Sequence, residues 1–173
     1  MGGFEVGDRV VYPPHGAGEV TSREVRDVLG VKRAYLTVRI LSSDMTLMVP
    51  ADGAEEAGLR PVMDAAGLAR LEAVLEDETD EEPGPFSRRF RQSKDRIRTG
   101  DPFELGGVIR NLTLREREKP LSSGERQLLE QARRVLASEV AYARRTDEDE
   151  ALAWLDARFA DGTAGVAADG PRS

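Results

Sequence analysis

The chain has 173 residues, 39% of them apolar and 33% charged, and its 25 lysines and arginines against 32 aspartates and glutamates give a net charge of −7. No apolar run reaches the roughly 18–20 residues of a membrane helix and no basic, apolar leader is recognised, so we expect a soluble, cytoplasmic protein. The absence of cysteine excludes a disulfide scaffold and a thiolate zinc site. The acidic total argues at first sight against a nucleic-acid partner.

The first sixty residues carry the signals of short antiparallel strands. Alternation within residues 34–41 places Leu36, Val38 and Ile40 on one face of a strand. Strands are predicted over residues 9–12, 19–28, 34–41 and 45–50, with turns at Gly16-Ala17-Gly18, Leu29-Gly30 and Ser42-Ser43-Asp44. This spacing predicts a small SH3-like or Tudor-like β-barrel.

After Pro61 the periodicity becomes helical. Asp64 is a predicted cap of a first helix, Asp101 caps a helix with Pro102 at its first position, and Ser122 and Glu125 form a capping box. Further helices are predicted over residues 86–99 and 148–160. The expected fold is therefore α+β by segments, with a β-barrel in residues 1–60, an all-α domain in residues 61–160 and a flexible tail in residues 161–173.

The charges are segregated along the chain. Residues 76–82 contain six acids and no base, whereas residues 88–98 contain five arginines and Lys94 against Asp95 alone. Because charges are screened over about 8 Å at physiological salt, a basic face can bind DNA inside an acidic protein. A solvated helix face is an equal alternative for the basic segment, and the acidic runs at 76–82 and 147–150 are interpreted as solvated.

The sequence offers little for catalysis. It contains neither a phosphate-binding loop nor a complete dinucleotide fingerprint, and its one histidine, His15, falls in a predicted turn. We expect no enzyme activity, no catalytic or metal-binding residues, no cofactor and no small-molecule substrate. Trp154, the single tryptophan, is predicted to pack against the helices.

Several segments, in order, resemble the CarD/CdnL family of bacterial transcription regulators. They run from Phe4-Glu5-Val6-Gly7-Asp8-Arg9-Val10-Val11-Tyr12-Pro13 and His15-Gly16, through Tyr35 to Ile40 and Val49-Pro50-Ala51, to Phe86-Ser87-Arg88-Arg89-Phe90-Arg91, Gly100-Asp101 and Leu121-Ser122-Ser123-Gly124-Glu125-Arg126. The resemblance extends from about Phe4 to Ala143.

The resemblance implies that the barrel binds the RNA polymerase β subunit and that the helical domain stabilises the open complex at the upstream edge of the melted promoter. In the family a tryptophan wedge enters the minor groove, and Phe86 stands at that position. The flanking basic positions correspond to Arg88, Arg89, Arg91 and Arg126. On the barrel, Arg26 matches a polymerase-contacting arginine, and Met48 matches a position that some members fill with arginine.

Two alternatives stay open at this point. From spacing alone Phe86 shares a helix face with Phe90 and Ile97, which favours a core residue, whereas the resemblance favours a wedge. Phe90 is the better candidate for the core. The second alternative is a protein–protein adaptor that uses its barrel and never contacts DNA.

Overall fold

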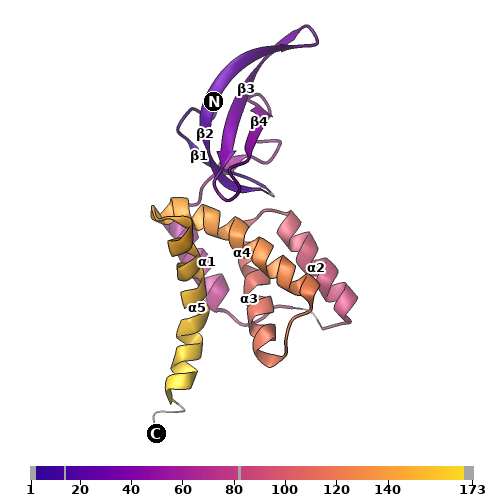
Figure 1. Cartoon of the computed structure of the whole chain (residues 1–173), viewed down its shortest axis with the longest axis vertical. Helices are drawn as coiled ribbons and strands as arrows, with labels where there is room; N and C mark the ends of the chain where they lie inside the picture. The colour runs from indigo at the N-terminus through magenta and orange to yellow at the C-terminus, as the bar shows by residue number, and fades with distance from the viewer. Residues whose placement is uncertain (1–2, 14, 82, 170–173) are drawn as a thin grey trace.

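The computed structural model describes the backbone of residues 3–13, 15–81 and 83–169, with side chains as far as Phe159. Within these residues an antiparallel sheet of five strands is followed by five helices (Figure 1), which confirms the predicted fold class. The strands, in the sheet order β4-β3-β2-β1-β5, are β1 (Arg9–Tyr12), β2 (Gly16–Val28), β3 (Val31–Ile40), β4 (Thr46–Pro50) and β5 (Arg60–Pro61). The helices are α1 (Ala65–Glu76), α2 (Phe86–Arg98), α3 (Pro102–Glu118), α4 (Ser123–Arg144) and α5 (Glu148–Asp169).

The β module, residues 3–61, wraps around its own apolar core. Leu36, Val38 and Ile40 of β3 are fully buried, as the alternation predicts. Strand β3 begins earlier than expected because Leu29 and Gly30, with φ of 55° and 80°, form a tight hairpin turn directly before it. The long β2–β3 hairpin projects away from the helices (Figure 1).

The turn predicted at Gly16-Ala17-Gly18 is wrong. These residues open β2, where Gly16 pairs with Tyr12 and Gly18 with Val10 of β1. Gly16 has a φ of +99°, and a side chain at this position would come within 2.8 Å of the Ser138 hydroxyl on α4. Gly16 therefore serves close packing against a helix rather than chain reversal. Gly18 serves close packing against β3, because a side chain there would clash with the Arg39 backbone.

Side-chain caps fix the starts of three helices where the sequence places them. Asp64 accepts a hydrogen bond from the Gly67 N–H, and Asp101 accepts from the second and third residues of α3. Ser122 and Glu125 form the predicted capping box of α4. One apolar core joins all five helices, and its buried members include Leu71, Ile97, Leu105, Val108, Ile109, Leu112, Leu136, Val140 and Leu155.

The last helix differs from its expected extent. Helix α5 begins at Glu148 as predicted, but its backbone is helical to Asp169, within the segment expected to be a flexible tail (residues 161–173). Residues 170–173 of that expected tail lie outside the described residues. Trp154 packs against the helical core, as predicted, with the guanidinium groups of Arg144 and Arg158 over its ring.

The β module docks onto α4 through polar contacts. The Ala17 N–H donates a 2.9 Å hydrogen bond to the Ser138 hydroxyl. Next to it, Arg60 of β5 forms a two-pronged ion pair with Glu139, at 2.9 and 2.8 Å. Glu139 is only 2% exposed and also accepts from the Met63 N–H at 2.8 Å. These contacts hold the two modules in one orientation.

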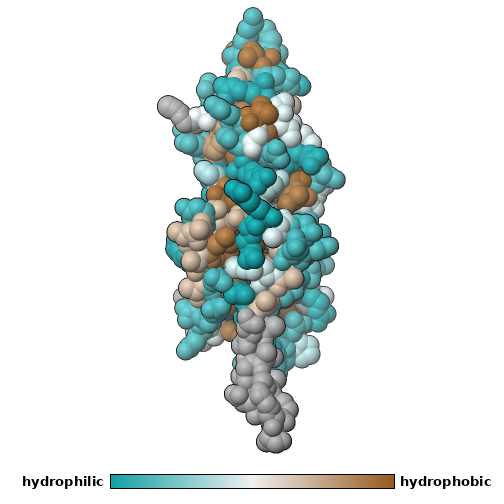
Figure 2. Space-filling model, turned by 90° about the vertical axis from the view of Figure 1, so that its left-hand side faces the viewer, coloured by the Kyte–Doolittle hydropathy of each residue, from teal (hydrophilic) through white to brown (hydrophobic). Residues whose placement is uncertain are grey.

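The surface of the described residues is mixed in character. Figure 2 shows separate hydrophobic patches among hydrophilic side chains on the side that it draws, two of them on the β module at the top. Exposed apolar residues of the β2–β3 hairpin include Val25, Val28, Leu29 and Val31. Among the described helices, none combines the length and apolar character needed to cross a membrane.

Candidate nucleic-acid interface

Helix α2 presents an aromatic ring at its first residue. The preceding Pro85 has extended backbone and provides no side-chain cap, so the helix begins directly at Phe86. The Phe86 side chain is 44% exposed and stacks on Phe90, with 5.5 Å between ring centroids. Phe90 in turn packs against the helical core, where its ring touches Gly124 at the start of α4. Phe90 is thus the core residue of the pair, and Phe86 projects beyond the core.

Two arginines beside Phe86 are exposed. Arg88 and Arg91 lie on the solvent side of α2, and neither forms an ion pair within the described part of the chain. Lys94, one turn further, lies over the Phe90 ring with its ammonium 5.7 Å from the centroid. These cations and the exposed ring occupy one end of the helical domain.

The other three bases of the segment are engaged by acids. Arg89 donates to the Gly84 carbonyl at 2.8 Å and lies 4.0 Å from Glu81. Arg98 pairs with Asp95 at 3.0 Å, three residues earlier on the same helix. Arg96 is held between acids from two other segments. The free cationic charge of α2 is therefore smaller than its composition indicates.

The acidic run at 76–82 is predicted to be solvated, and for Glu81, whose side chain is 16% exposed, this is wrong; Asp80 is exposed as predicted but is held by ion pairs. Asp80 lies 3.0 Å from Arg96 and 2.8 Å from the buried Arg110, and it accepts a 2.9 Å hydrogen bond from Asn111. Glu81 pairs with Arg115 of α3. Asp80 and Glu81 lie in the linker between α1 and α2. Their ion pairs with arginines that are distant in sequence hold this linker against α2 and α3.

The ionisation of Asp80 reflects these partners. Burial alone would raise its pKa, but hydrogen bonds from Asn111 and Arg96, with the charges of Arg96 and Arg110, lower the pKa to about 2. Burial would likewise lower the pKa of Arg96, and its bonds to Asp80 and Glu104 raise it instead. The cluster is fully charged at neutral pH.

Arg126 lies in the first turn of α4 and is exposed. Its guanidinium donates to the Leu121 carbonyl at 3.2 Å. The contact between Phe90 and Gly124 brings the N-terminal ends of α2 and α4 together, so Arg126 belongs to the same end of the domain as Phe86. Four of the five predicted DNA-binding residues have exposed side chains: Phe86, Arg88, Arg91 and Arg126. The fifth, Arg89, is bonded within the chain.

The two barrel residues share a face of the sheet. Arg26 pairs with Arg33 of β3, and Met48 of the edge strand β4 pairs with Thr37. Arg33 and Thr37 are four residues apart on β3, so both pairs point to the same face of the sheet, opposite the core. Along β3 the two pairs are roughly 13 Å apart. Met48 is 44% exposed, and Arg26 is half-exposed beside Glu24 at 3.1 Å.

Sequence reasoning missed the polar groups that shape this end of the molecule. Asp80, Asn111 and Arg110 are each unremarkable in the sequence, and they meet only after α1, α2 and α3 pack. The one available signal was the juxtaposition of an acidic run with a basic run across Pro83-Gly84-Pro85.

Comparisons with known proteins cover both modules. Residues 4–63 match the family described as "CarD-like/TRCF RID domain", and residues 70–156 match "CarD, C-terminal domain". The protein YdeB of Bacillus subtilis (strain 168) is 32% identical over 137 residues, which cover 79% of this chain and 90% of YdeB. The solution NMR structure of the 72-residue N-terminal domain of Myxococcus xanthus CarD shares 36% identity over 34% of this chain and 79% of that domain, with a TM-score of 0.30.

Proposed function

Because this chain belongs to the CarD family of bacterial transcription regulators, we propose that it binds RNA polymerase through the β module and promoter DNA through the helical domain. The polymerase contact is to the β subunit, and the DNA contact is at the upstream edge of the melted region. The protein then acts in the cytoplasm, at the nucleoid.

The observation that carries the DNA contact is the exposure of Phe86 beside arginines that form no ion pair among the described residues. An apolar side chain can enter a base step of the minor groove and unstack it, at a cost of a few kcal/mol that added contact offsets. Arg88, Arg91 and Arg126 are suited to flank such a wedge, since guanidinium groups bind phosphates in a forked geometry. Phenylalanine is smaller than tryptophan and lacks its N–H donor, so we expect a weaker wedge than in tryptophan-bearing members.

The mechanism follows from differential affinity. A wedge at the edge of the melted region has its binding site in the open complex and not in the closed one. The protein therefore shifts the equilibrium toward the open complex by the ratio of its two affinities. An acidic protein has a low affinity for free DNA. Binding of the β module to polymerase offsets this, because it raises the local concentration of the helical domain at the promoter.

The polymerase contact is proposed for the outward face of the sheet that carries Arg26 and Met48. Strand β4 is an edge strand, whose outward backbone groups are available to a partner. We expect Arg26→Glu to reduce co-purification with RNA polymerase, while Lys32→Glu, an equal charge change on the same hairpin, retains it. Equal loss in both variants would count against this face.

The wedge is tested by open-complex lifetime. Phe86→Ala should lower the free energy of unfolding by no more than about 1.5 kcal/mol, because the half-exposed ring contributes only its stack on Phe90, and should shorten the lifetime of the polymerase–promoter open complex. Phe86→Trp should lengthen it. Phe90→Ala is the matched control and should destabilise the helical domain. If Phe86→Ala unfolds that domain as well, Phe86 is a core residue and the wedge is wrong.

The phosphate contacts are tested by salt dependence. Arg88→Gln and Arg91→Gln should each reduce the slope of log K against log salt for duplex DNA by about 0.9. Arg89→Gln should have a smaller effect, because this side chain is bonded to Gly84 and faces Glu81. Unchanged slopes in both of the first two variants would favour the adaptor function, in which the helices never contact DNA.

A further inference from the structure

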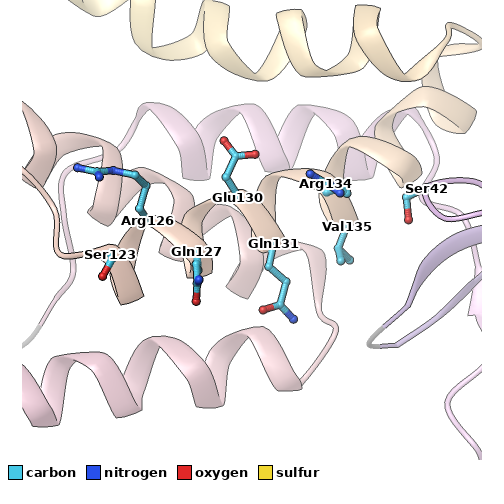
Figure 3. A pocket seen from close by; sticks show the side chains of 8 residues that line it. All are labelled: Ser42, Ser123, Arg126, Gln127, Glu130, Gln131, Arg134 and Val135. Atoms are coloured by element: carbon cyan, nitrogen blue, oxygen red, sulfur yellow. The ribbon is translucent and has the colours of Figure 1, made fainter.

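An open groove runs along the exposed side of α4. One hollow of about 530 Å³ is lined by Ser42, Ser123, Arg126, Gln127, Glu130, Gln131, Arg134 and Val135. Figure 3 shows Gln127 and Gln131 pointing from α4 to one side of it and Arg126 and Glu130 to the other. A second hollow of about 220 Å³, between α2 and α4, is lined by Lys94, Ile97, Arg98, Leu128 and Gln131. Gln131 lines both, so the two hollows adjoin at this side chain.

We propose that this α2–α4 groove binds the sugar-phosphate backbone of one DNA strand, extending the interface at Phe86 toward the β module. The inference rests on the proposed function and adds a strand path and new contact residues to it. Two features identify the occupant: the charge of the residues that line the groove and the direction in which the groove runs.

The charge of the lining is complementary to DNA. It contains four bases, Lys94, Arg98, Arg126 and Arg134, against the single acid Glu130, and of the four bases Arg98 is paired with Asp95. That acid is already paired with Arg133 at 3.2 Å. The remaining polar lining residues are serines and glutamines, which are side chains that commonly donate to phosphate oxygens.

The direction of the groove fits a strand that leaves the wedge. Phe90 touches Gly124, while Lys94 and Ile97 line a hollow with Leu128 and Gln131, so α2 and α4 run side by side from the Phe86 end. The groove starts at Ser123, the first residue of α4, and ends at Ser42 in the β3–β4 turn. Along α2, residues 86–98 span roughly 18 Å, the axial length of about five phosphates on one strand.

The polar residues of α4 that line the groove are also exposed to solvent and lie outside the core. Arg126, Gln127, Gln131 and Arg134 are all exposed. Their substitution changes the surface of the groove without altering the core beneath it.

The test uses the full chain and a duplex oligonucleotide with one unpaired end, with binding followed by fluorescence anisotropy at several salt concentrations. Arg134→Gln and Lys94→Gln should each reduce the slope of log K against log salt by about 0.9. Lys32→Gln, which removes an exposed charge on the distant hairpin, should leave the slope unchanged. Gln131→Glu should weaken binding several-fold and Gln131→Arg should strengthen it.

The outcomes separate this inference from the function on which it rests. If Arg88→Gln reduces the slope while the Arg134, Lys94 and Gln131 variants do not, DNA binding stands and the groove path is wrong. If none of the variants alters DNA binding, the proposed function fails as well. If the groove variants lower affinity for RNA polymerase and not for DNA, the groove holds a protein partner and the inference is overturned.

Discussion

Asp80 shows how a single linker carboxylate can contribute to the stability of the helical domain. Its contacts with Arg96, Arg110 and Asn111 join the acidic linker to α2 and α3. Removing the charge leaves the buried Arg110 guanidinium without its carboxylate partner, which costs more than the loss of a surface pair.

The pKa of Asp80 gives this contribution a defined pH window. Its pKa is about 2 in the folded chain against an ordinary value of 3.8. A depressed folded pKa contributes stability above the ordinary pKa, and this contribution is lost as the pH falls toward 2. Because the side chain is 55% exposed, solvent screening limits the contribution to about 1 kcal/mol.

We therefore expect Asp80→Asn to lower the free energy of unfolding by about 1 kcal/mol at pH 7. The difference from wild type should shrink between pH 4 and pH 2. Denaturant titrations at several pH values measure it, with Asp27→Asn on the exposed hairpin as the control. A difference that stays constant down to pH 2 would show that the charge of Asp80 is not its source.

The acidic linker and α2 form the element pair in which the sequence and the structure diverge most. Read along the chain, residues 88–98 are a strongly basic helix and residues 76–82 a solvated acidic run. In the fold, Glu81 pairs with Arg115 and faces Arg89 across 4.0 Å, so part of the basic helix is neutralised. The linker thus reduces the free cationic charge that the helix presents to solvent.

Neutralising Glu81 should release Arg89. We expect Glu81→Gln to raise the affinity for duplex DNA a few-fold and to steepen the salt dependence by up to about 0.9 in the log–log slope. The cost is reduced stability, because Arg115 loses one of its two carboxylate partners and keeps only Glu125, at 3.8 Å. Anisotropy titrations measure the affinity and denaturant titrations the stability.

Glu78→Gln is the matched control for this prediction. Glu78 belongs to the same acidic run, is exposed and forms no ion pair in the described part of the chain. Equal gains in the two variants would mean that the linker acts only through its net charge and that the Arg89 contact has no role.

Other features of the elements were predictable because they depend on near neighbours. The caps at Asp64, Asp101 and Ser122 each join a side chain to an N–H within three residues. The buried alternation in β3 is equally local, since it needs only a pleated strand with one covered face. Gly16 and Gly18 were misassigned to a turn because the helix and strand that pack against them lie far away in sequence.

At the scale of the whole molecule, Arg60 and Glu139 determine how the β module meets the helices. They are 79 residues apart and form a two-pronged pair in which Glu139 is almost fully buried. The proposed function, with polymerase on one module and DNA on the other, gains from a fixed orientation, because a loose linkage lowers the effective concentration of the proposed wedge at its site.

Breaking this pair should be asymmetric. Arg60→Leu leaves the Glu139 carboxylate buried with one remaining N–H donor and should cost about 3–5 kcal/mol. Glu139→Gln leaves a neutral side chain and a partly exposed arginine, and should cost less. Denaturant titrations measure both effects, and equal losses would mean that burial of Glu139 is not the dominant cost.

The same variants test the rigid linkage. At saturating protein, Glu139→Gln should shorten the open-complex lifetime even though it alters neither Phe86 nor the exposed arginines. Polymerase co-purification and binding to isolated DNA should remain at wild-type levels. A wild-type lifetime would mean that the orientation of the modules does not limit function.

The sequence by itself determined the order of a β module and a helical domain, the caps, the buried strand face and, through its ordered motifs, the family. Each depends on residues close in the chain or on a pattern in one dimension. Only the tertiary structure decided which charges are free. Coulomb energies depend on distance and burial, so an arginine counted as basic in the sequence becomes part of a neutral pair once Asp80 or Glu81 reaches it. The exposure of Phe86 beside the partly buried Phe90 was likewise settled by the packing of α2 against α4.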